Sequence, residues 1–288
     1  METELRVIGG EGRAPRLKCP PKSCECHSHI YGPADLYPRI AGRHPPYLAT
    51  VDAYDAMLKR LGIERAVIVQ PALYGRDNRA TLDAIRALGL DRARGIAVTR
   101  PDVGKGELSD LHEAGIRGMR FYLLAGDLTL KDAPDMARRI APFGWHIQVQ
   151  AQGHWMEEAM PQLAKLPVDV VVDHVGRTPA DTGVQDKGFQ ALLRFLETGR
   201  CWVKISAPYL SSLDGPPKFA DLGPRIRALA EARPDRLVWA ANWPHPGHED
   251  GKRPEEADAL DILLDWVADA KTRDAIMADN PARLYGFE

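Results

Sequence analysis

Short apolar runs and amphipathic segments alternate along most of the chain. The runs, such as residues 65–70 and 236–242, are rich in apolar residues and are typical of strands buried on both faces. In the segments between them apolar residues recur every three or four positions, as Leu260, Leu263 and Val267 do, which is the pattern of a helix that buries one side. This alternation predicts a parallel sheet whose outer face is covered by helices.

Eight units of one strand and one helix can be counted. The strands are expected at residues 23–31, 65–70, 94–99, 117–123, 146–150, 168–174, 201–206 and 236–242. The helices are expected at residues 50–62, 78–89, 107–115, 133–141, 155–166, 188–198, 220–232 and 255–270. Eight such units in 288 residues favour a single-domain (β/α)8 TIM barrel. An open, doubly wound sheet is the alternative, but no G-x-G-x-x-G turn follows the first strand.

No change of composition divides the barrel into smaller units. Residues 1–22 are expected to form an irregular N-terminal arm, and residues 23–288 the barrel domain. Residues 32–49 are rich in proline and glycine, so a long loop is expected after the first strand. The charged run at residues 249–256 is expected to be a solvated loop over the mouth of the barrel.

Charge and composition exclude several classes of partner. The net charge of −2 and the pI near 6.5 give no basis for binding nucleic acid or an anionic membrane. No apolar run reaches the roughly 18 residues that span a bilayer, and the first 21 residues lack the apolar core of a secretory signal. A cytoplasmic protein is therefore expected, and whether it is a monomer or a homo-oligomer is left open.

Three of the four cysteines lie close to two histidines near the N-terminus. The C-x4-C-x-C spacing lacks the paired C-x2-C knuckles of structural zinc sites. On a regular strand Cys24 and Cys26 also share one face, while His27 and His29 share the other. A structural zinc cluster is therefore not expected.

Polar residues recur at the carboxyl ends of the predicted strands. In a barrel these ends and the loops after them surround the functional pocket. A pocket is therefore predicted that contains side chains from the following set: His27, His29, Gln70, Thr99, Arg120, Gln150, His174, Ser206 and Asn242.

Two of these strand ends suggest specific chemistry. His27 and His29 are separated by one residue, which puts their side chains roughly 6–7 Å apart along a strand, close enough to converge on one metal ion or one bound oxygen. Asn242 follows the last strand, where an amide can hold a substrate or a water molecule. It cannot take a proton at neutral pH.

Several of these residues lie in motifs that resemble the amidohydrolase superfamily, in the branch that contains 2-pyrone-4,6-dicarboxylate lactonase and galactarolactone isomerase. The likeness covers nearly the whole chain. It rests on residues 25–29 (E-C-H-S-H), 75–78 (G-R-D-N), 94–98 (R-G-I-A-V), 118–121 (G-M-R-F), 173–177 (D-H-V-G-R), 243–245 (W-P-H) and 280–281 (N-P). The resemblance implies a barrel of the amidohydrolase type.

The resemblance also bears on metal binding. In the wider superfamily a metal is held by H-x-H and by residues on strands four, five, six and eight. Here strands four, five and eight carry Arg120, Gln150 and Asn242 in the expected ligand positions. The branch includes enzymes that use these histidines without a metal to polarise a lactone carbonyl. No cofactor is therefore expected, and the alternative is one Zn²⁺ held by His27, His29 and His174.

Departures from the pyrone lactonase point to a different use of the pocket. The resemblance implies that an aspartate on strand eight activates water in that enzyme, and Asn242 replaces it here. Its arginines and tyrosine for a planar dicarboxylate are missing, because Gly126, Gln150 and Leu210 stand where they are expected, and only Arg120 is retained.

Other positions look more like the galactarolactone isomerase, which lacks the base and moves the acyl group between hydroxyls of its own substrate. These positions are residues 76–78 (R-D-N), Gln150, residues 209–212 (Y-L-S-S) and residues 242–245 (N-W-P-H). The isomerase lacks the first histidine of H-x-H, which His27 supplies here. The chain is thus expected to be an enzyme acting on a small carboxylated lactone, such as a sugar-acid lactone, with isomerisation favoured. Hydrolysis to the open-chain acid is the alternative, and a non-catalytic binding barrel is the third hypothesis.

The expected site residues follow from these hypotheses. The catalytic residues are expected to be His27, His29, His174 and Asn242. The substrate-binding residues are expected to be Arg120, which pairs with the carboxylate, and also Tyr74, Gln150, Tyr209 and His245. If the reaction is hydrolysis, His174 and His245 are the candidates for the base.

Overall fold

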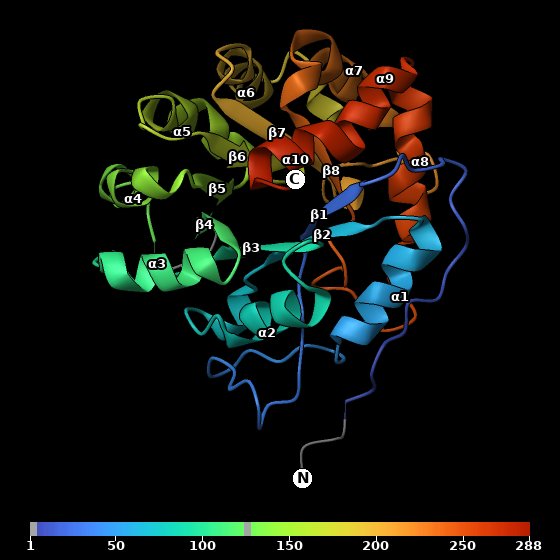
Figure 1. The fold of residues 1–288 in the computed structure, drawn as a ribbon. Coiled ribbons are helices and arrows are strands. Elements are labelled where there is room, and N and C mark those ends of the chain that lie inside the picture. Colours follow the sequence, from blue (N-terminus) through green and yellow to red (C-terminus); the bar gives the residue numbers. More distant parts are fainter. Residues whose placement is uncertain (1–4, 124–127) are drawn as a thin grey trace.

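Eight parallel strands form one sheet in the computed structural model, which describes residues 5–123 and 128–288 (Figure 1). The strands pair in chain order, and His29 donates from its backbone N–H to the carbonyl of Trp243 at 2.8 Å, which brings the two edges together. The predicted (β/α)8 barrel is confirmed. The strands are β1 (Cys24–Ser28), β2 (Arg65–Val69), β3 (Ala93–Ala97), β4 (Ile116–Tyr122), β5 (His146–Gln150), β6 (Val170–Val172), β7 (Cys201–Ser206) and β8 (Leu237–Ala240).

A helix follows each strand and packs on the outside of the sheet (Figure 1). These helices are α1 (Val51–Leu61), α2 (Arg79–Leu88), α3 (Lys105–Glu113), α4 (Ala133–Ile140), α5 (Met156–Leu163), α6 (Lys187–Glu197), α7 (Gly223–Ala232) and α8 (Glu256–Trp266). Three further segments follow α8 that the sequence pattern did not predict. They are α9 (Ala270–Asp274), a π-helical turn (Ala275–Asp279) and α10 (Asn280–Tyr285).

The first strand was predicted at residues 23–31 and β1 covers only Cys24–Ser28, and two further strands are shorter than predicted because the chain turns sharply where they end. His174 and Val175, predicted at the end of or just after the sixth strand, have φ angles of 54° and 51°, so β6 stops at Val172. Asn242 has a φ of 64°, and β8 stops at Ala240. Asparagine tolerates this left-handed region better than most residues. Both turns lie at the carboxyl ends of strands, where the chain leaves the wall of the barrel.

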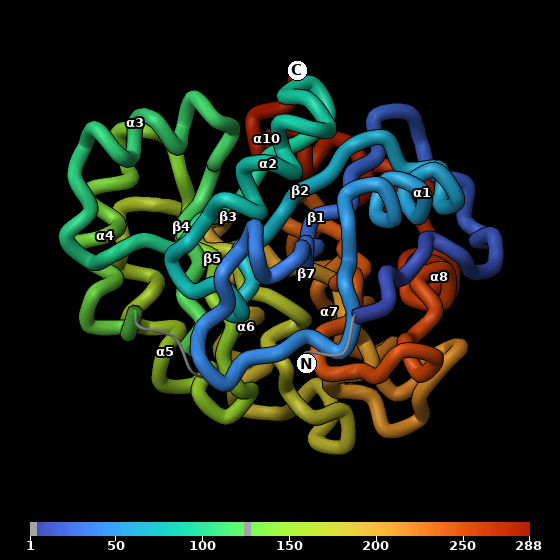
Figure 2. The backbone as a smooth tube through the Cα atoms, turned by 90° about the horizontal axis from the view of Figure 1, so that it is seen from below, coloured from blue at the N-terminus to red at the C-terminus, as the bar shows by residue number. Residues whose placement is uncertain are grey.

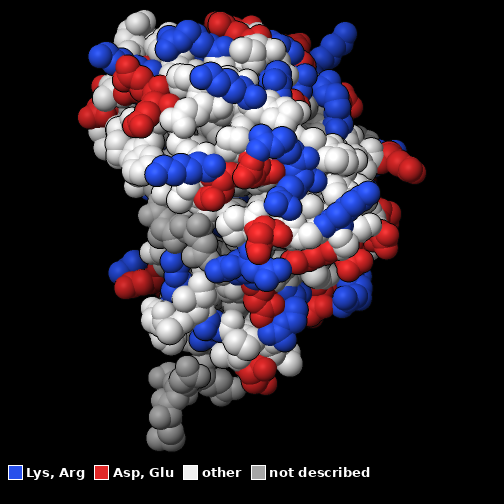
Figure 3. Space-filling model, turned by 90° about the vertical axis from the view of Figure 1, so that its left-hand side faces the viewer, with Lys and Arg blue, Asp and Glu red and all other residues white. Residues whose placement is uncertain are grey.

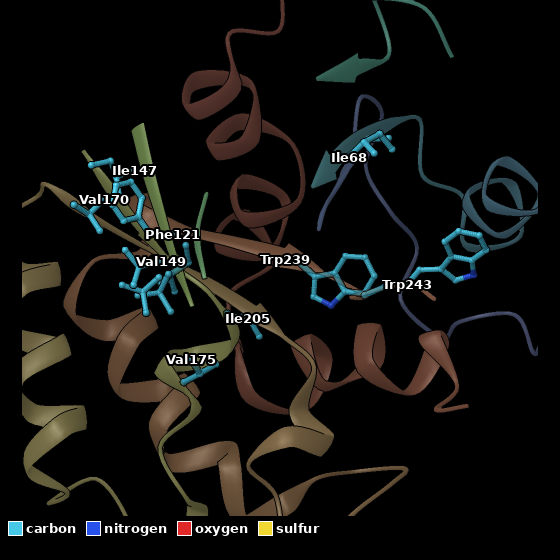
Figure 4. Close-up of a cluster of buried hydrophobic side chains, with 14 of the residues drawn as sticks. Ile68, Phe121, Ile147, Val149, Val170, Val175, Ile205, Trp239 and Trp243 are labelled. Atoms are coloured by element: carbon cyan, nitrogen blue, oxygen red, sulfur yellow. The ribbon is translucent and has the colours of Figure 1, made fainter. Parts of the chain in front are cut away.

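The apolar core has an inner and an outer part. Inside the barrel, side chains such as Val67, Val171 and Val238 pack with Tyr285 of α10. Because strand side chains alternate, the neighbouring positions point outward and pack under the helices. Figure 4 shows part of this outer core, with the labelled side chains Ile68, Phe121, Ile147, Val149, Val170, Val175, Ile205, Trp239 and Trp243.

A register shift in β1 corrects one expectation about its faces. The pairing of β1 with β2 is irregular between Glu25 and Ser28. Cys24 and Cys26 belong to the inner core, and yet His27 also contacts inward-facing side chains of other strands. The expectation that these cysteines and His27 occupy opposite faces is therefore wrong, because the irregularity breaks the strict alternation.

The N-terminal arm is packed against the barrel domain along part of its length. Ile8 and Leu17 are buried, and Val7 pairs with Leu48 of the loop after β1. The carboxylate of Asp261 on α8 accepts hydrogen bonds from the backbone N–H groups of Arg16 and Leu17 at 2.8 and 3.0 Å. Figure 1 shows the arm in blue beside α8. A domain boundary at residue 22 stays a prediction.

The described surface carries both signs of charge. On the face drawn in Figure 3, lysines and arginines are interspersed with aspartates and glutamates. Among the described residues no helix is both long enough and apolar enough to cross a membrane.

Candidate active site

A pocket of about 490 Å³ lies at the carboxyl ends of the strands, where the sequence predicts one. Its polar lining comes from β4 and β5, through Arg120 and Gln150, and from the segments directly after β1, β6 and β8, through His29, His174 and Asn242. Residues 42–46 of the loop after β1, the blue segment in front of the strands in Figure 2, form part of its rim. The pocket thus brings together five of the nine side chains that the sequence predicts to act there.

His27 and His29 approach each other at the floor of this pocket. Their Nε2 atoms lie 3.3 Å apart, with the two rings nearly perpendicular. The Nδ1 atom of His29 lies 2.7 Å from the carbonyl oxygen of Val69, which can only accept, so this nitrogen carries the hydrogen. The neutral ring of His29 therefore presents a lone pair at Nε2. His27 does not line the pocket and is fully buried beneath it.

A buried polar cluster supports His27 from inside the barrel. Asp173 Oδ1 lies 3.2 Å from His27 Nδ1 and 3.5 Å from the ammonium nitrogen of Lys204. Lys204 donates to the carbonyl of Cys26 at 2.8 Å and to Gln148 Oε1 at 2.7 Å, and Gln148 donates to Asp173 Oδ2 at 3.0 Å. We call Asp173, Lys204, Gln148 and His27 the histidine cluster.

The sequence analysis missed Lys204 and Gln148, although a signal was available. Both lie at inward positions of strands that are buried along their whole length, in C-W-V-K-I-S and H-I-Q-V-Q. A charged or amide side chain that would face a barrel interior needs a buried partner. Which partner it finds depends on the neighbouring strands, so the strand sequence alone does not identify Asp173.

Burial lowers the pKa of all three site histidines. Burial lowers the pKa of His29 to about 3, and the nearby guanidinium of Arg120 contributes. Burial also lowers the pKa of His27 well below its usual range, with the positive charge of Lys204 as the next cause. The pKa of His174 is lowered well below its usual range by burial and by the proximity of His27. All three rings are therefore neutral at physiological pH.

His174 differs from His29 in what holds it. Its Nδ1 atom lies 2.8 Å from the hydroxyl oxygen of Ser206 on β7. A hydroxyl can donate as well as accept, so the Nε2 atom of His174 is able to carry the hydrogen. Of the two histidines that line the pocket, His174 is thus the one that can donate a hydrogen bond while it is neutral.

Arg120 is fixed by its neighbours but keeps an unused donor. One Nη donates to the carbonyl of Gln70 at 2.7 Å, and the other donates to Gln150 Oε1 at 2.6 Å. The guanidinium also lies over the ring of Tyr122. Its Nε atom is buried without a hydrogen-bond partner. Because a buried donor without a partner is costly, this N–H favours the binding of an acceptor such as a carboxylate.

Asn242 heads a second set of buried polar side chains. Its Nδ2 donates to the hydroxyl of Tyr209 at 2.8 Å, and that hydroxyl lies 3.1 Å from Nδ1 of His245. Nε2 of His245 lies 3.0 Å from Glu256 Oε1, and the other oxygen of Glu256 accepts from Arg60. We call Asn242, Tyr209, His245 and Glu256 the asparagine chain.

Glu256 corrects an expectation, because the run 249–256 was predicted to be solvated. Its side chain begins α8 and is only 3% exposed. Tyr209 and His245, which were predicted to bind substrate, lie behind Asn242 and do not line the pocket. The hydroxyl of Tyr74 accepts from the backbone N–H of Gly32 at 2.9 Å and holds the loop after β1. The substrate-binding roles of these three residues stay predictions.

Two arginines that the sequence analysis did not single out also line the pocket. They are Arg43, from the loop after β1, and Arg177, whose Nε is buried without a hydrogen-bond partner. Arg177 belongs to the D-H-V-G-R motif, so a signal for it was present. Leu210 lines the pocket, while Gly126 lies outside the described residues. Among the described residues of the lining there is no aspartate or glutamate.

The possible ligands for a divalent metal ion lie in the histidine cluster and beside it. His27, Asp173 and His174 offer ligand atoms within 4.8 Å of one another, so a carboxylate replaces one histidine of the set expected from the sequence. However, Asp173 already faces the ammonium of Lys204, and the positive charges of Lys204 and Arg120 both lower the pKa of His27. A divalent ion would be the third positive charge in a buried space. These residues do not fit it well.

Comparisons with known proteins agree with this architecture. A family model described as amidohydrolase matches residues 24–287. A 2-pyrone-4,6-dicarboxylate hydrolase of Comamonas testosteroni is 34% identical over 94% of this chain and 92% of its own length. A D-galactarolactone isomerase of Agrobacterium fabrum is 28% identical over 95% of this chain and 94% of its own. An Agrobacterium tumefaciens protein of known structure superposes with a TM-score of 0.90 at 28% identity, over 98% of this chain and 99% of that one.

Proposed function

The chain belongs to the amidohydrolase family, and from that premise we propose that it is an enzyme acting on the ester bond of a small carboxylated lactone. The favoured reaction is isomerisation, in which a hydroxyl of the substrate attacks the lactone carbonyl and a new ring replaces the old one. The observation that carries this preference is the pocket lining, which has no carboxylate among its described residues and presents Asn242 after the last strand.

The carboxylate of the substrate binds Arg120. The buried Nε–H of this guanidinium has no partner, and its geometry is fixed by Gln70 and Gln150. A planar guanidinium can bind a carboxylate through two parallel hydrogen bonds. Arg177 and Arg43 add positive charge to the pocket, which favours an anionic substrate.

The carbonyl oxygen of the lactone accepts a hydrogen bond from Nε2 of His174. Negative charge develops on this oxygen when the nucleophile attacks, and a preorganised donor contributes roughly 3–4 kcal/mol to the transition state. The hydroxyl of Ser206 can donate to Nδ1 and so allows the tautomer that donates from Nε2. The low pKa of His174 keeps it neutral, so it donates without becoming charged.

Asn242 orients the attacking hydroxyl, and His29 moves its proton. When the new C–O bond has formed, the attacking oxygen is strongly acidic, and the lone pair at Nε2 of His29 accepts its proton. An imidazolium whose pKa is about 3 readily returns that proton to the departing ring oxygen. Protons and atoms therefore balance without water. For this transfer the Nε2 lone pair of His29 must stay free, so neutral His27, whose Nε2 lies 3.3 Å away, carries its hydrogen on Nδ1, toward Asp173.

Intramolecular attack tolerates the lack of a strong base better than hydrolysis does. A hydroxyl within the bound lactone is already close to the carbonyl, and such positioning can be worth roughly 7–11 kcal/mol. A water molecule lacks this advantage and depends on a general base, which typically contributes roughly 10²–10⁴-fold. The pocket offers water only imidazoles whose pKa values are low.

We also propose that the reaction requires no metal. The electrostatic argument is that Lys204 already supplies a positive charge beside Asp173 and His27. Hydrolysis to the open-chain acid is the second candidate function. The similarity to a 2-pyrone-4,6-dicarboxylate hydrolase favours it.

One assay separates the two reactions. The enzyme is incubated in ¹⁸O-labelled water with a panel of aldaro-, aldono- and pyrone lactones, and the products are followed by NMR and mass spectrometry. We expect an isomerised lactone without ¹⁸O as the main product of at least one carboxylated sugar lactone. Mainly ¹⁸O-labelled open-chain acid would overturn the isomerase proposal. No turnover of any lactone would overturn lactone chemistry.

A further inference from the structure

The asparagine chain ends at the pocket with an amide and begins in the protein with an ion pair. Glu256 is paired with Arg60, and Arg60 also donates to Glu255 Oε1 at 2.8 Å. His245 is fully buried and Glu256 almost so. A buried chain of this kind has a direction, because every oxygen or nitrogen in it must either donate or accept.

The direction can be worked out from the carboxylate. Burial raises the pKa of Glu256, but the hydrogen bond with His245 and the charge of Arg60 outweigh burial and lower the pKa below its usual value. This group is therefore ionised and only accepts. His245 must then donate from Nε2. In a neutral His245, Nδ1 carries the lone pair and accepts from the hydroxyl of Tyr209.

The same reasoning fixes the amide. The hydroxyl of Tyr209 has given its hydrogen to His245, so its oxygen can only accept from Asn242. Asn242 therefore turns Nδ2 toward Tyr209, at 2.8 Å, and its Oδ1 is left to accept a hydrogen bond from another group. An isolated asparagine at the same position could present either atom to the pocket.

We propose that Glu256, His245 and Tyr209 are positioning residues that turn the Asn242 amide so that Oδ1 accepts from the attacking hydroxyl of the substrate. The catalytic consequence of this inference rests on the proposed function, whereas the direction of the hydrogen bonds in the asparagine chain does not depend on it. The chain transfers no proton during the reaction. Before the attack it directs the hydroxyl hydrogen toward Oδ1, which leaves an oxygen lone pair free to face the lactone carbonyl, and His29 takes the proton only after the new C–O bond has formed.

A second proton on His245 would reverse the direction of the hydrogen bonds from His245 to Asn242. Nδ1 would then donate to Tyr209, the tyrosine hydroxyl would donate to the amide oxygen, and Nδ2 would face the pocket. Two groups contact the ring of His245 directly, Tyr209 at Nδ1 and Glu256 at Nε2. Farther away lie the ring of His248, at a centroid distance of 6.5 Å, and Arg60, which pairs with Glu256. Tyr47 donates to the carbonyl of the adjacent Pro244.

The substitution Asn242→Asp tests the direction of the chain without any substrate. A carboxylate at residue 242 can only accept, so Tyr209 must donate to it and His245 must donate to Tyr209 while still donating to Glu256. That arrangement requires a doubly protonated ring. We therefore expect the ¹⁵N signal of His245 Nδ1 to change from that of an unprotonated nitrogen in the wild type to that of a protonated nitrogen in Asn242→Asp at the same pH.

The measurement is ¹⁵N NMR of protein labelled at histidine, recorded at one pH, with the His245 signals assigned by substitution. Gln150→Glu is the matched control, because it puts a carboxylate in the same pocket but outside the chain, and we expect a smaller shift. Adding Tyr209→Phe to Asn242→Asp removes the connecting hydroxyl and should abolish most of the shift. Equal His245 Nδ1 signals in wild type and Asn242→Asp, or a change of signal that survives Tyr209→Phe, would refute the asparagine chain.

Kinetics tests the catalytic consequence. Tyr209→Phe and Glu256→Gln both remove the fixed direction of the amide, and we expect kcat for isomerisation to fall about tenfold while KM changes less than twofold. Thermal unfolding identifies any variant that has lost its fold. If Glu256→Gln is misfolded, Tyr209→Phe, which removes a single hydroxyl, decides whether the positioning role holds. If the NMR shift is found but no lactone is isomerised, the proposed function is wrong while the direction of the asparagine chain is supported. An unchanged kcat in a folded Tyr209→Phe that isomerises the lactone overturns the positioning role.

Discussion

The histidine cluster and the asparagine chain support the same pocket but differ in how their charges are placed. The histidine cluster holds its charges next to the reacting site, since Lys204 and Asp173 lie 3.5 Å apart and within 3.4 Å of His27. The asparagine chain holds its charges at the far end, where Glu256 pairs with Arg60, and presents a neutral amide to the pocket.

The comparison shows two ways to set up a polar group. Burial lowers the pKa of the imidazoles and keeps them neutral, and the nearby positive charge of Lys204 adds to this effect. A chain of hydrogen bonds that starts from a distant charge decides which atom of a neutral group faces the substrate. The first arrangement should be the more important for stability, and the second for the outcome of the reaction.

The largest expected effect is on stability. Lys204→Met keeps most of the side-chain volume but leaves the carboxylate of Asp173 buried without its positive partner, which should cost about 3–5 kcal/mol of unfolding free energy. Urea unfolding measures this. Lys187→Met, at an exposed position of α6, is the matched control and should change stability by less than about 0.5 kcal/mol. A similar small change for Lys204→Met would contradict the ion pair.

The asparagine chain should respond mainly in its chemistry. Asn242→Asp adds a carboxylate that can act as a general base toward water, so the ratio of ring-opened acid to isomerised lactone should rise by about 10²-fold. The product ratio in ¹⁸O-labelled water measures this change. Aspartate also tolerates the φ of 64°, so the fold should be retained. If the wild type already yields mainly labelled acid and the variant is no faster, the isomerase proposal is wrong.

Acid should weaken the histidine cluster and its neighbours. The pKa of His29 is about 3 in the folded protein and about 6.5 in the unfolded chain. The unfolded state therefore binds more protons below pH 6.5, so this contribution to stability is present above that pH and declines as the pH falls. His29 alone should cost on the order of 2 kcal/mol between pH 6.5 and 5.

Urea unfolding at several pH values tests this dependence on acid. A shallower dependence in His29→Gln than in wild type supports the assignment, because the glutamine does not titrate. Identical slopes for the two proteins would show that His29 is not the group that takes up the proton.

Arg120→Lys should have a smaller effect than the changes above, because lysine keeps the positive charge. It loses only the planar guanidinium that can bind both oxygens of a carboxylate. We expect kcat/KM for a carboxylated lactone to fall about tenfold, and to fall further in Arg120→Met. Arg86→Lys, at an exposed position, is the control. If both Arg120 variants stay within about twofold of wild type, this residue does not bind the carboxylate.

Removal of metal should have the smallest effect. Because Lys204 already supplies a positive charge in the histidine cluster, dialysis against a chelator should leave kcat/KM within about twofold of its starting value. Elemental analysis of the purified protein accompanies the assay. Stoichiometric zinc, with activity lost on chelation and restored by zinc, would contradict this prediction.

The sequence predicted the barrel and the location of its pocket because both depend on local pattern. Apolar runs and helical stripes repeat over windows of ten to fifteen residues, so each of the eight units could be identified separately, as with β5 at residues 146–150. The polar residues after these runs, including Arg120 and Asn242, were identified as pocket residues for the same reason.

The tertiary structure alone decided how those residues are used. The irregular pairing of β1 turned His27 inward, and the neighbouring strands supplied Asp173 and Lys204 as its partners. Likewise Glu256 was predicted to be solvated, and only the fold of α8 against the turn after β8 buries it beside His245. A strand pattern describes which face a side chain takes, whereas the partner of a buried charge is set by distances between segments far apart in the chain. Those distances exist only once the barrel has closed.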